Sequence, residues 1–235
     1  MTAGGRDGGD GRRGAAPGLG PWAPLAVDEV AGLLAGVAAT WWLSGGYALD
    51  RFLGGPSRPH GDIDVSVARA GWPAVRAALA GRLELLAAAG GALGDLPADD
   101  RALTSAWARD RGGGPWRLQV SIEEVEGARW VYRRDRRVSC PMARAVLLVD
   151  GVPCVAPAVQ LLWKAKAPRP VDELDYRALL PRLPPADRAW LGRSIRLAHP
   201  ASPWAARAGL RPAGPAWQAG REPGGDGRAD EGRFG

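Results

Sequence analysis

The stretch LSGGYALDRFLGGPSRPHGDIDVSV, residues 43–67, constrains the fold more than any other part of the chain. The apolar run Trp41–Leu43 predicts a strand, a Ser-Gly-Gly turn ends it, and Tyr47–Phe52 can follow as a short helix. Paired glycines allow positive φ and a close approach of the backbone to a ligand. Backbone N–H groups at a helix N-terminus bind phosphate. The stretch therefore predicts a strand, a phosphate-binding turn and a helix.

The second strand predicted in this stretch, residues 62–67, carries two aspartates. Residues i and i+2 of a strand share a face, so Asp62 and Asp64 point the same way and the apolar residues between them point into a core. Two adjacent carboxylates repel each other, and a divalent cation relieves the repulsion. Mg²⁺ suits such oxygen ligands and also binds phosphate oxygens. The turn and the pair predict a Mg–nucleoside triphosphate site, whereas an exposed hairpin with two solvated aspartates is the less specific alternative.

These residues also resemble a known family. Ser44-Gly45-Gly46 followed by Asp62-x-Asp64 resembles the nucleotidyltransferase signature of the DNA polymerase β superfamily. The residues from Trp42 to Asp50, Gly54 and Arg58-x-His60-x-Asp62-Ile-Asp64-Val65 are similar to the aminoglycoside 2''-adenylyltransferase-like family, many of whose bacterial members have no established substrate. The resemblance covers about residues 25–204 and includes Trp130-Val-Tyr-Arg-Arg-Asp135, Lys164-Ala-Lys-Ala-Pro-Arg-Pro170 and Asp172-x-x-Asp175.

The expected fold is α/β (α+β), with a mixed sheet of nucleotidyltransferase type flanked by helices and a helical C-terminal region. Strand patterns outnumber helix patterns in the middle of the chain, which favours a mixed sheet over a wholly parallel one. We expect a nucleotidyltransferase domain at 21–156 and a helical region at 157–208. The Gly-rich tails 1–20 and 209–235 have little to bury and are predicted to be disordered.

The resemblance implies a Mg-dependent transfer of a nucleoside monophosphate, AMP from ATP, to a hydroxyl of a small acceptor such as an aminoglycoside, and a role in antibiotic resistance. Asp62 and Asp64 would hold Mg²⁺ on the triphosphate of ATP. The phosphates would lie on the turn formed by Ser44, Gly45 and Gly46. Such transfer needs mainly positioning and charge neutralisation. By the same resemblance Arg58 and His60 position phosphate or order the loop, although a purely structural role for both is an open alternative.

The chain departs from the family where a third carboxylate is usual. The predicted strand Trp116–Ile122 carries Gln119 and Ser121 on the face expected to point at the metal. Glu123 continues the same alternation and is the expected third catalytic residue. Glu124, Asp172 and Asp175 are its substitutes. These three are also expected to form an acidic, substrate-binding pocket for a cationic aminoglycoside.

Lys164 and Lys166 are the only lysines among 31 basic residues. This bias predicts that one of them supplies a compact ammonium group that neutralises triphosphate charge. Because residues i and i+2 lie on different sides of a helix, only one lysine can face the ligand. Lys166, next to the Pro168–Pro170 bend, is the one expected to do so. The alternative is that both are ordinary solvated lysines.

The amino-acid composition limits the kinds of partner and the location that we expect for the protein. The formal charge of +6 suits polyanions such as triphosphates, and Arg133–Arg137 is the only basic cluster, so no nucleic-acid partner is expected. Two cysteines without a CxxC pattern fit a reducing cytoplasm, and two histidines make a zinc site implausible. No apolar run reaches membrane-spanning length. We expect a cytoplasmic monomer or homodimer without membrane contacts.

Two further functions stay open. A catalytically weak nucleotide-binding or regulatory protein would explain the missing third aspartate. A nucleotidyltransferase toxin that modifies RNA would use Arg133–Arg137. Release of pyrophosphate separates an enzyme from the first alternative, and a steep salt dependence of RNA affinity would indicate the second.

Overall fold

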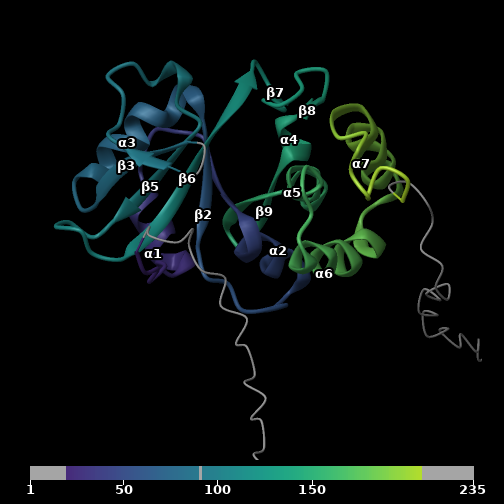
Figure 1. The fold of residues 1–235 in the computed structure, drawn as a ribbon, viewed down its shortest axis with the longest axis horizontal. Helices are drawn as coiled ribbons and strands as arrows, with labels where there is room; N and C mark the ends of the chain where they lie inside the picture. Colours follow the sequence, from purple (N-terminus) through teal and green to yellow (C-terminus); the bar gives the residue numbers. More distant parts are fainter. Residues whose placement is uncertain (1–19, 90–91, 208–235) are drawn as a thin grey trace, which may run out of the picture.

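The computed structural model describes residues 20–89 and 92–207 (Figure 1). Almost all of both tails predicted to be disordered thus lies outside the described residues. That part of the chain holds seven α-helices: α1 (Val27–Leu34), α2 (Gly45–Leu53), α3 (Trp72–Ala80), α4 (Met142–Ala145), α5 (Pro157–Lys164), α6 (Pro170–Leu179) and α7 (Pro185–Ala198). None of the described helices is long and apolar enough to cross a membrane.

Ten strands in the described residues form one mixed sheet. They are β1 (Trp41–Ser44), β2 (Asp64–Ala68), β3 (Glu84–Ala89), β4 (Ala92–Gly94), β5 (Ser105–Arg109), β6 (Trp116–Glu126), β7 (Arg129–Val131), β8 (Ser139–Pro141), β9 (Val146–Val149) and β10 (Val152–Val155). The strand order is β4-β3-β5-β6-β2-β1-β10-β9, and β7 and β8 extend from β6. Because β2 pairs antiparallel with β1 and parallel with β6, the predicted mixed sheet is confirmed.

One face of the sheet is apolar. The alternation predicted for 116–122 is present: Leu118, Val120 and Ile122 are fully buried, while Gln119 and Ser121 are partly exposed. Figure 1 shows α1 and α3 on the side of the molecule that holds β3, β5 and β6. Their apolar residues, among them Val30, Leu34, Val75 and Leu79, belong to the same core as the buried residues of β6. This packing leaves the opposite face of the sheet for polar side chains.

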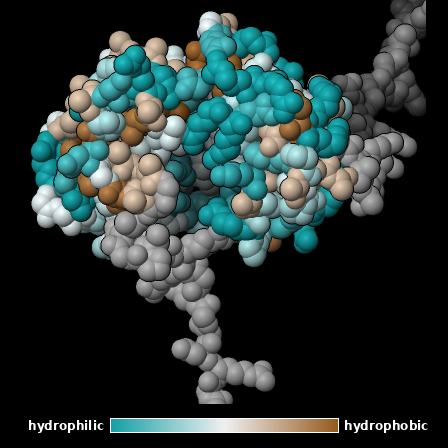
Figure 2. All heavy atoms as spheres, turned by 45° about the horizontal axis from the view of Figure 1, so that its top comes forward, coloured by the Kyte–Doolittle hydropathy of each residue, from teal (hydrophilic) through white to brown (hydrophobic). Residues whose placement is uncertain are grey.

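The helices after β10 form a second lobe. Between Val155 and Arg207 the chain consists of helices and turns, in agreement with the helical C-terminal region predicted from residue 157. In Figure 1 these helices lie with α4 and β7–β9 on one side of β2, opposite α1 and α3. We call these parts the helical lobe (α4–α7 with β7–β9) and the sheet lobe (α1, α3 and β2–β6). Figure 2 shows a hollow between the lobes, with a largely hydrophilic wall on the helical side.

One detail of the strand predicted over residues 62–67 is wrong, because Asp62 lies before β2, which begins at Asp64. Residues Ala92–Gly94 have weak strand propensity but form β4, because pairing with β3 at the sheet edge overrides that propensity. Helix α1 ends at Leu34, since its C-cap Ala35 has an extended backbone and Gly36 has a φ of 74°. Cys140 and Cys154 are free and buried, and burial raises the pKa of both thiols to about 11.

Candidate active site

The glycine turn packs against two side chains. Ser44 ends β1 and is the N-cap of α2, and Gly45 has a φ of 69°. A Cβ on Gly45 would overlap the carboxylate of Asp64, and one on Gly46 would overlap the ring of His60. Both glycines are therefore needed for the approach of these side chains, not only for the approach of a ligand. The turn and Asp64 form one packed unit.

Replacing Gly45 with Ala should damage this unit. The left-handed backbone costs a residue with a Cβ about 1 kcal/mol, and the overlap with Asp64 adds about as much again or more. Gly54→Ala is the matched control, because Gly54 has a φ of 81° but open space around its Cβ position. Chemical denaturation should show a larger loss of stability in Gly45→Ala than in Gly54→Ala. Equal losses would contradict the packing of Asp64 on the turn.

The two aspartates lie where the turn and β2 meet. The antiparallel register places Asp64 opposite Ser44. Asp64 is partly buried and Asp62 is exposed. Burial and the negative charge of Asp62 raise the pKa of Asp64 to about 7, against the opposing charges of Lys164 and Arg169. This coupling indicates that the carboxylates face a common region, and that a negative pair there is unfavourable without a cation.

The donor set fits a metal that arrives with a phosphate ligand. Among residues 20–89 and 92–207 there is no cluster of three or more His, Cys, Asp or Glu side chains suited to a metal. Mg²⁺ is commonly held by one or two carboxylates, with water and substrate phosphates completing its shell. Asp62 and Asp64 therefore fit Mg²⁺ bound together with a triphosphate better than a permanent, fully protein-coordinated ion.

The raised pKa of Asp64 gives a prediction for the metal-free protein. An unfolded Asp titrates near 3.8, whereas Asp64 in the folded chain titrates at about 7. Between these values only the folded chain keeps the proton, so stability falls as pH rises through this window. With a chelator present, the wild type should lose at least about 1 kcal/mol relative to Asp64→Asn between about pH 5 and pH 8. Denaturation curves of both proteins with the same pH dependence would contradict this.

Gln119 occupies the position beside Asp64 on the neighbouring strand. The parallel register pairs Asp64 with Gln119, Ser66 with Ser121 and Ala68 with Glu123. Glu123 is thus four residues farther along the strand, about 13 Å from the level of Asp64. It is buried, and the Trp130 indole donates to its carboxylate at 3.1 Å. The geometry therefore does not bring Glu123 to the aspartate pair, contrary to its expected place as third carboxylate.

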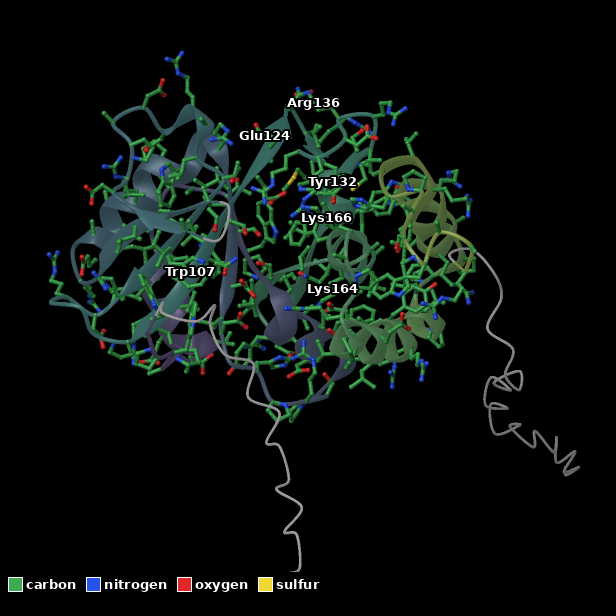
Figure 3. The ribbon with its side chains drawn as sticks, viewed as in Figure 1. Trp107, Glu124, Tyr132, Arg136, Lys164 and Lys166 are labelled. Atoms are coloured by element: carbon green, nitrogen blue, oxygen red, sulfur yellow. The ribbon has the colours of Figure 1, made fainter. Side chains whose placement is uncertain are left out.

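Lys164 rather than Lys166 faces the aspartates. The side chain of Lys164, at the end of α5, is 9% exposed, and its charge acts on Asp64. Its Nζ lies 2.7 Å from Asp172 Oδ1 and 3.0 Å from Asp175 Oδ2. Lys166 lies beyond the end of α5 and is exposed, so the expected order of the two lysines is reversed. Figure 3 labels both on the helical side of the molecule.

Asp172 and Asp175 belong to a buried ion network. Both carboxylates come from α6 and are nearly inaccessible, at 2% and 4% exposed. Burial alone would raise the pKa of Asp172, but hydrogen bonds from Arg169 and Lys164 hold it below its ordinary value. The Nε and Nη2 atoms of Arg58 donate to both oxygens of Asp175 at 3.0 and 3.1 Å. These carboxylates are therefore neutralised inside the protein and do not form the open acidic pocket that was expected.

His60 has both ring nitrogens engaged. Arg58 Nη1 donates to His60 Nδ1 at 2.9 Å, so His60 Nε2 carries the proton and donates to Asp50 Oδ2 at 2.7 Å. Asp50 Oδ1 also accepts the Ser57 N–H at 2.9 Å. This arrangement ties the loop before β2 to α2 and, through Arg58, to α6. It favours the structural alternative for Arg58 and His60, in which they order the loop.

Two residues near the site were missed by the sequence reasoning. Arg169, the N-cap of α6, lies close enough for its charge to act on Asp62 and Asp64. It was part of the Lys164–Pro170 string quoted for the resemblance, which was the available signal. Gln160 of α5 accepts the N–H of Gly45 at 2.8 Å. That contact joins residues 115 positions apart in the sequence, so no local sequence pattern predicts it. Glu124 lies elsewhere, paired with Arg69 at 2.7 Å.

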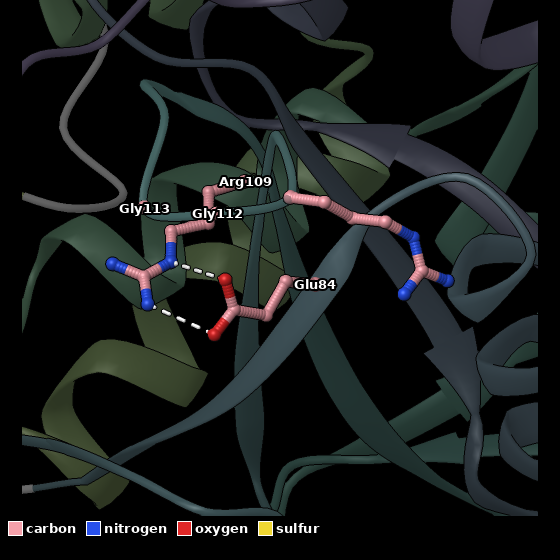
Figure 4. Close-up of a pocket in the computed structure, with 5 residues that line it drawn as sticks. Glu84, Arg109, Gly112 and Gly113 are labelled. Carbon is pink, nitrogen blue, oxygen red and sulfur yellow. Dashed lines mark hydrogen bonds and ion pairs between the residues drawn. The ribbon is translucent and has the colours of Figure 1, made fainter.

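A second hollow lies at the far side of the sheet lobe. Its volume is about 460 Å³, and Glu84, Arg109 and Arg111 line it with two glycines. The two hydrogen bonds between Arg109 and Glu84, both 2.9 Å, cross it in Figure 4. This hollow lies on β3 and β5, and β6 separates these two strands from β2. Because its charges are paired and it lacks the turn and the aspartates, this second hollow is not the candidate active site.

Known proteins share this fold and part of this sequence. Residues 26–84, which include the turn and both aspartates, match the family model of aminoglycoside-2''-adenylyltransferase. The solution structure of the antibiotic-resistance factor ANT(2'')-Ia has a TM-score of 0.51 and 16% identity, over 74% of this chain and 91% of that one. The fold is therefore that of a nucleotidyltransferase. No curated protein matches the chain in sequence.

Two further structures are similar at lower scores. The crystal structure of ANT(2'')-Ia in complex with adenylyl-2''-tobramycin has a TM-score of 0.49 and 16% identity, over 73% of this chain and 95% of that one. The lincomycin-bound lincosamide antibiotic adenylyltransferase LnuA has a TM-score of 0.48 and 15% identity, over 65% of this chain and 93% of that one. The match to the aminoglycoside-2''-adenylyltransferase model confirms the resemblance noted in the sequence for residues 26–84, and the fold agrees with it.

Proposed function

We propose that the protein transfers AMP from Mg-ATP to a hydroxyl of a small acceptor. The observation that carries the proposal is the packing of the Asp64 carboxylate on the Gly45 turn, with the negative charge of Asp62 acting on it. This unit combines a helix N-terminus suited to phosphate with a carboxylate pair that requires a cation. The family match over residues 26–84 and the nucleotidyltransferase fold support the same reading.

Each group of the site has a part in the proposed reaction. Asp62 and Asp64 would hold Mg²⁺, which supplies charge neutralisation and orientation to the phosphates. The charges of Lys164 and Arg169 act on Asp64, and these two cations would stabilise the negative charge that builds up on the leaving pyrophosphate. The Ser44 hydroxyl, 3.2 Å from Ser66 Oγ, and the N–H groups of the turn bind phosphate oxygens. The N–H of Gly45 would then exchange its contact with Gln160 for phosphate.

A catalytically weak nucleotide-binding protein is the second candidate. It is favoured by one observation: the neutral Gln119 is paired with Asp64, at a position where the resemblance implies a carboxylate. The RNA-modifying alternative has less support, because Arg136 and Arg137 of the basic cluster are paired with Glu126 and Asp135. A cytoplasmic location and a monomeric or dimeric state remain part of the proposal.

Two measurements test the proposal. Calorimetry with ATP, in the presence and absence of Mg²⁺, should show binding that depends on the metal. Pyrophosphate release in a panel of hydroxylated acceptors should then exceed the rate without acceptor. Binding without acceptor-dependent release would favour the nucleotide-binding alternative, and absence of any nucleotide binding would overturn both.

A further inference from the structure

The sheet places a row of four residues across the site. The strand registers pair Ser44 with Asp64, Asp64 with Gln119, and Gln119 with Trp107. Paired residues project from the same face of a sheet. Adjacent strands are about 4.8 Å apart, so Trp107 lies about 10 Å from Asp64 along the row. A small molecule can span that distance. In Figure 3 Trp107 lies on the sheet lobe and Lys164 on the helical side.

The row has two ends with different chemistry. Ser44 begins the phosphate-binding turn, and the charges of Lys164 and Arg169 act on Asp64 from the helical lobe. In a nucleotidyl transfer the attacking and leaving oxygens are roughly in line across the phosphorus. If pyrophosphate leaves toward the turn and the two cations, the acceptor must approach from the side of Gln119 and Trp107.

Trp107 offers a rigid aromatic surface at the acceptor end. Its ring packs edge-on against Trp22, with centroids 5.0 Å apart, and against Trp116 at 5.3 Å. It is only partly buried. A fixed aromatic ring binds apolar groups and the apolar faces of sugars at little entropic cost. Gln119 next to it can donate to and accept from a hydroxyl but adds no charge.

Several carboxylates of the sheet and helical lobes are already paired with cations. Glu84 is paired with Arg109 at 2.9 Å, Asp110 with Arg117 at 3.7 Å and Glu124 with Arg69 at 2.7 Å. Asp172 and Asp175 are buried with Arg58, Lys164 and Arg169. Asp62 and Asp64 are assigned to the metal. A polyamine would therefore lose hydration without finding a free partner among these paired carboxylates.

Resting on the proposed function, we propose that the acceptor binds against Gln119 and Trp107, and that it is a hydroxylated molecule with an apolar or sugar-ring face and at most one ammonium group. This assignment gives the site a specificity opposite to that expected from the acidic residues in the sequence. Trp107 binds the acceptor ring, and Gln119 orients the hydroxyl toward the phosphorus.

The test measures binding to the protein saturated with Mg²⁺ and a non-hydrolysable ATP analogue. The probes are phenyl β-D-glucoside with no amine, lincomycin with one, and tobramycin as a polyamine. At least one of the first two should bind more tightly than tobramycin at physiological salt. Trp107→Ala should weaken that binding about tenfold, as expected for a lost stacking contact, while Trp107→Phe should restore most of it. The affinity for the nucleotide analogue should be the same in all three proteins.

The outcomes separate the inference from the function on which it rests. Absence of analogue binding to the wild type would overturn the proposed function, and the acceptor site with it. Normal analogue binding combined with tightest binding of tobramycin would overturn the acceptor class alone. Normal analogue binding with no probe bound, or with probe binding unchanged in Trp107→Ala, would overturn the acceptor site while leaving the function intact.

Discussion

Asp64→Asn is expected to reduce acceptor-dependent pyrophosphate release by about a hundredfold to a thousandfold or more, without unfolding the protein. The substitution keeps the size of the side chain but removes a metal-binding charge, and single electrostatic contacts to a transition state are commonly worth this much. Asp62→Asn should act in the same direction. Both variants should bind ATP with little dependence on Mg²⁺, which calorimetry measures directly.

The control for this prediction is Asp95→Asn. Asp95 is an exposed aspartate of the sheet lobe, and it forms no ion pair or hydrogen bond within residues 20–89 and 92–207. Its loss changes the net charge by the same amount, so the rate should stay near that of the wild type. If Asp64→Asn kept full Mg-dependent activity, the assignment of the metal site would be wrong.

The second large effect concerns Lys164. Lys164→Ala should raise the dissociation constant for Mg-ATP at least about tenfold, because it removes the buried cation that faces the aspartate pair. It should also lower stability by a few kcal/mol, since Asp172 and Asp175 lose a partner at 2.7 and 3.0 Å. Lys166→Ala is the matched control and should change neither quantity by more than about 0.5 kcal/mol, as expected of an exposed side chain.

Loss of folding and loss of binding can be separated. Lys164→Arg keeps the charge and should recover stability more fully than affinity, because a guanidinium differs in shape from an ammonium. Affinities are compared on protein shown to be folded by circular dichroism at the temperature of the binding experiment. Equal, negligible effects of Lys164→Ala and Lys166→Ala on Mg-ATP binding would mean that neither lysine binds the nucleotide.

Some of the site could be read from local sequence because its cause is local. A glycine pair after an apolar run predicts a turn at a helix N-terminus, and Ser44 and Gly45 form that turn. The alternation over 116–122 predicts which residues are buried, and Leu118, Val120 and Ile122 are. Strand periodicity and glycine stereochemistry act over a few residues, so one sequence suffices to apply them.

The partners of charged residues could not be predicted in the same way. Asp172 and Asp175 looked available for a cationic substrate until α6 was placed against Lys164 and Arg58. Lys166 looked better placed than Lys164 until the end of α5 was known. Ion pairs depend on how helices dock, and a single residue of difference at a helix end turns a side chain by about 100°.

The sequence by itself determined the turn, the Asp62–Asp64 motif, the alternating strand and the change to helices near Pro157, because each depends on neighbours in the chain. Only the tertiary structure decided the register that places Gln119 and Trp107 in line with Asp64. It also decided that Glu123 lies with Trp130, away from the aspartates. Register and helix docking are set by packing between distant segments, and local patterns carry no information about that packing.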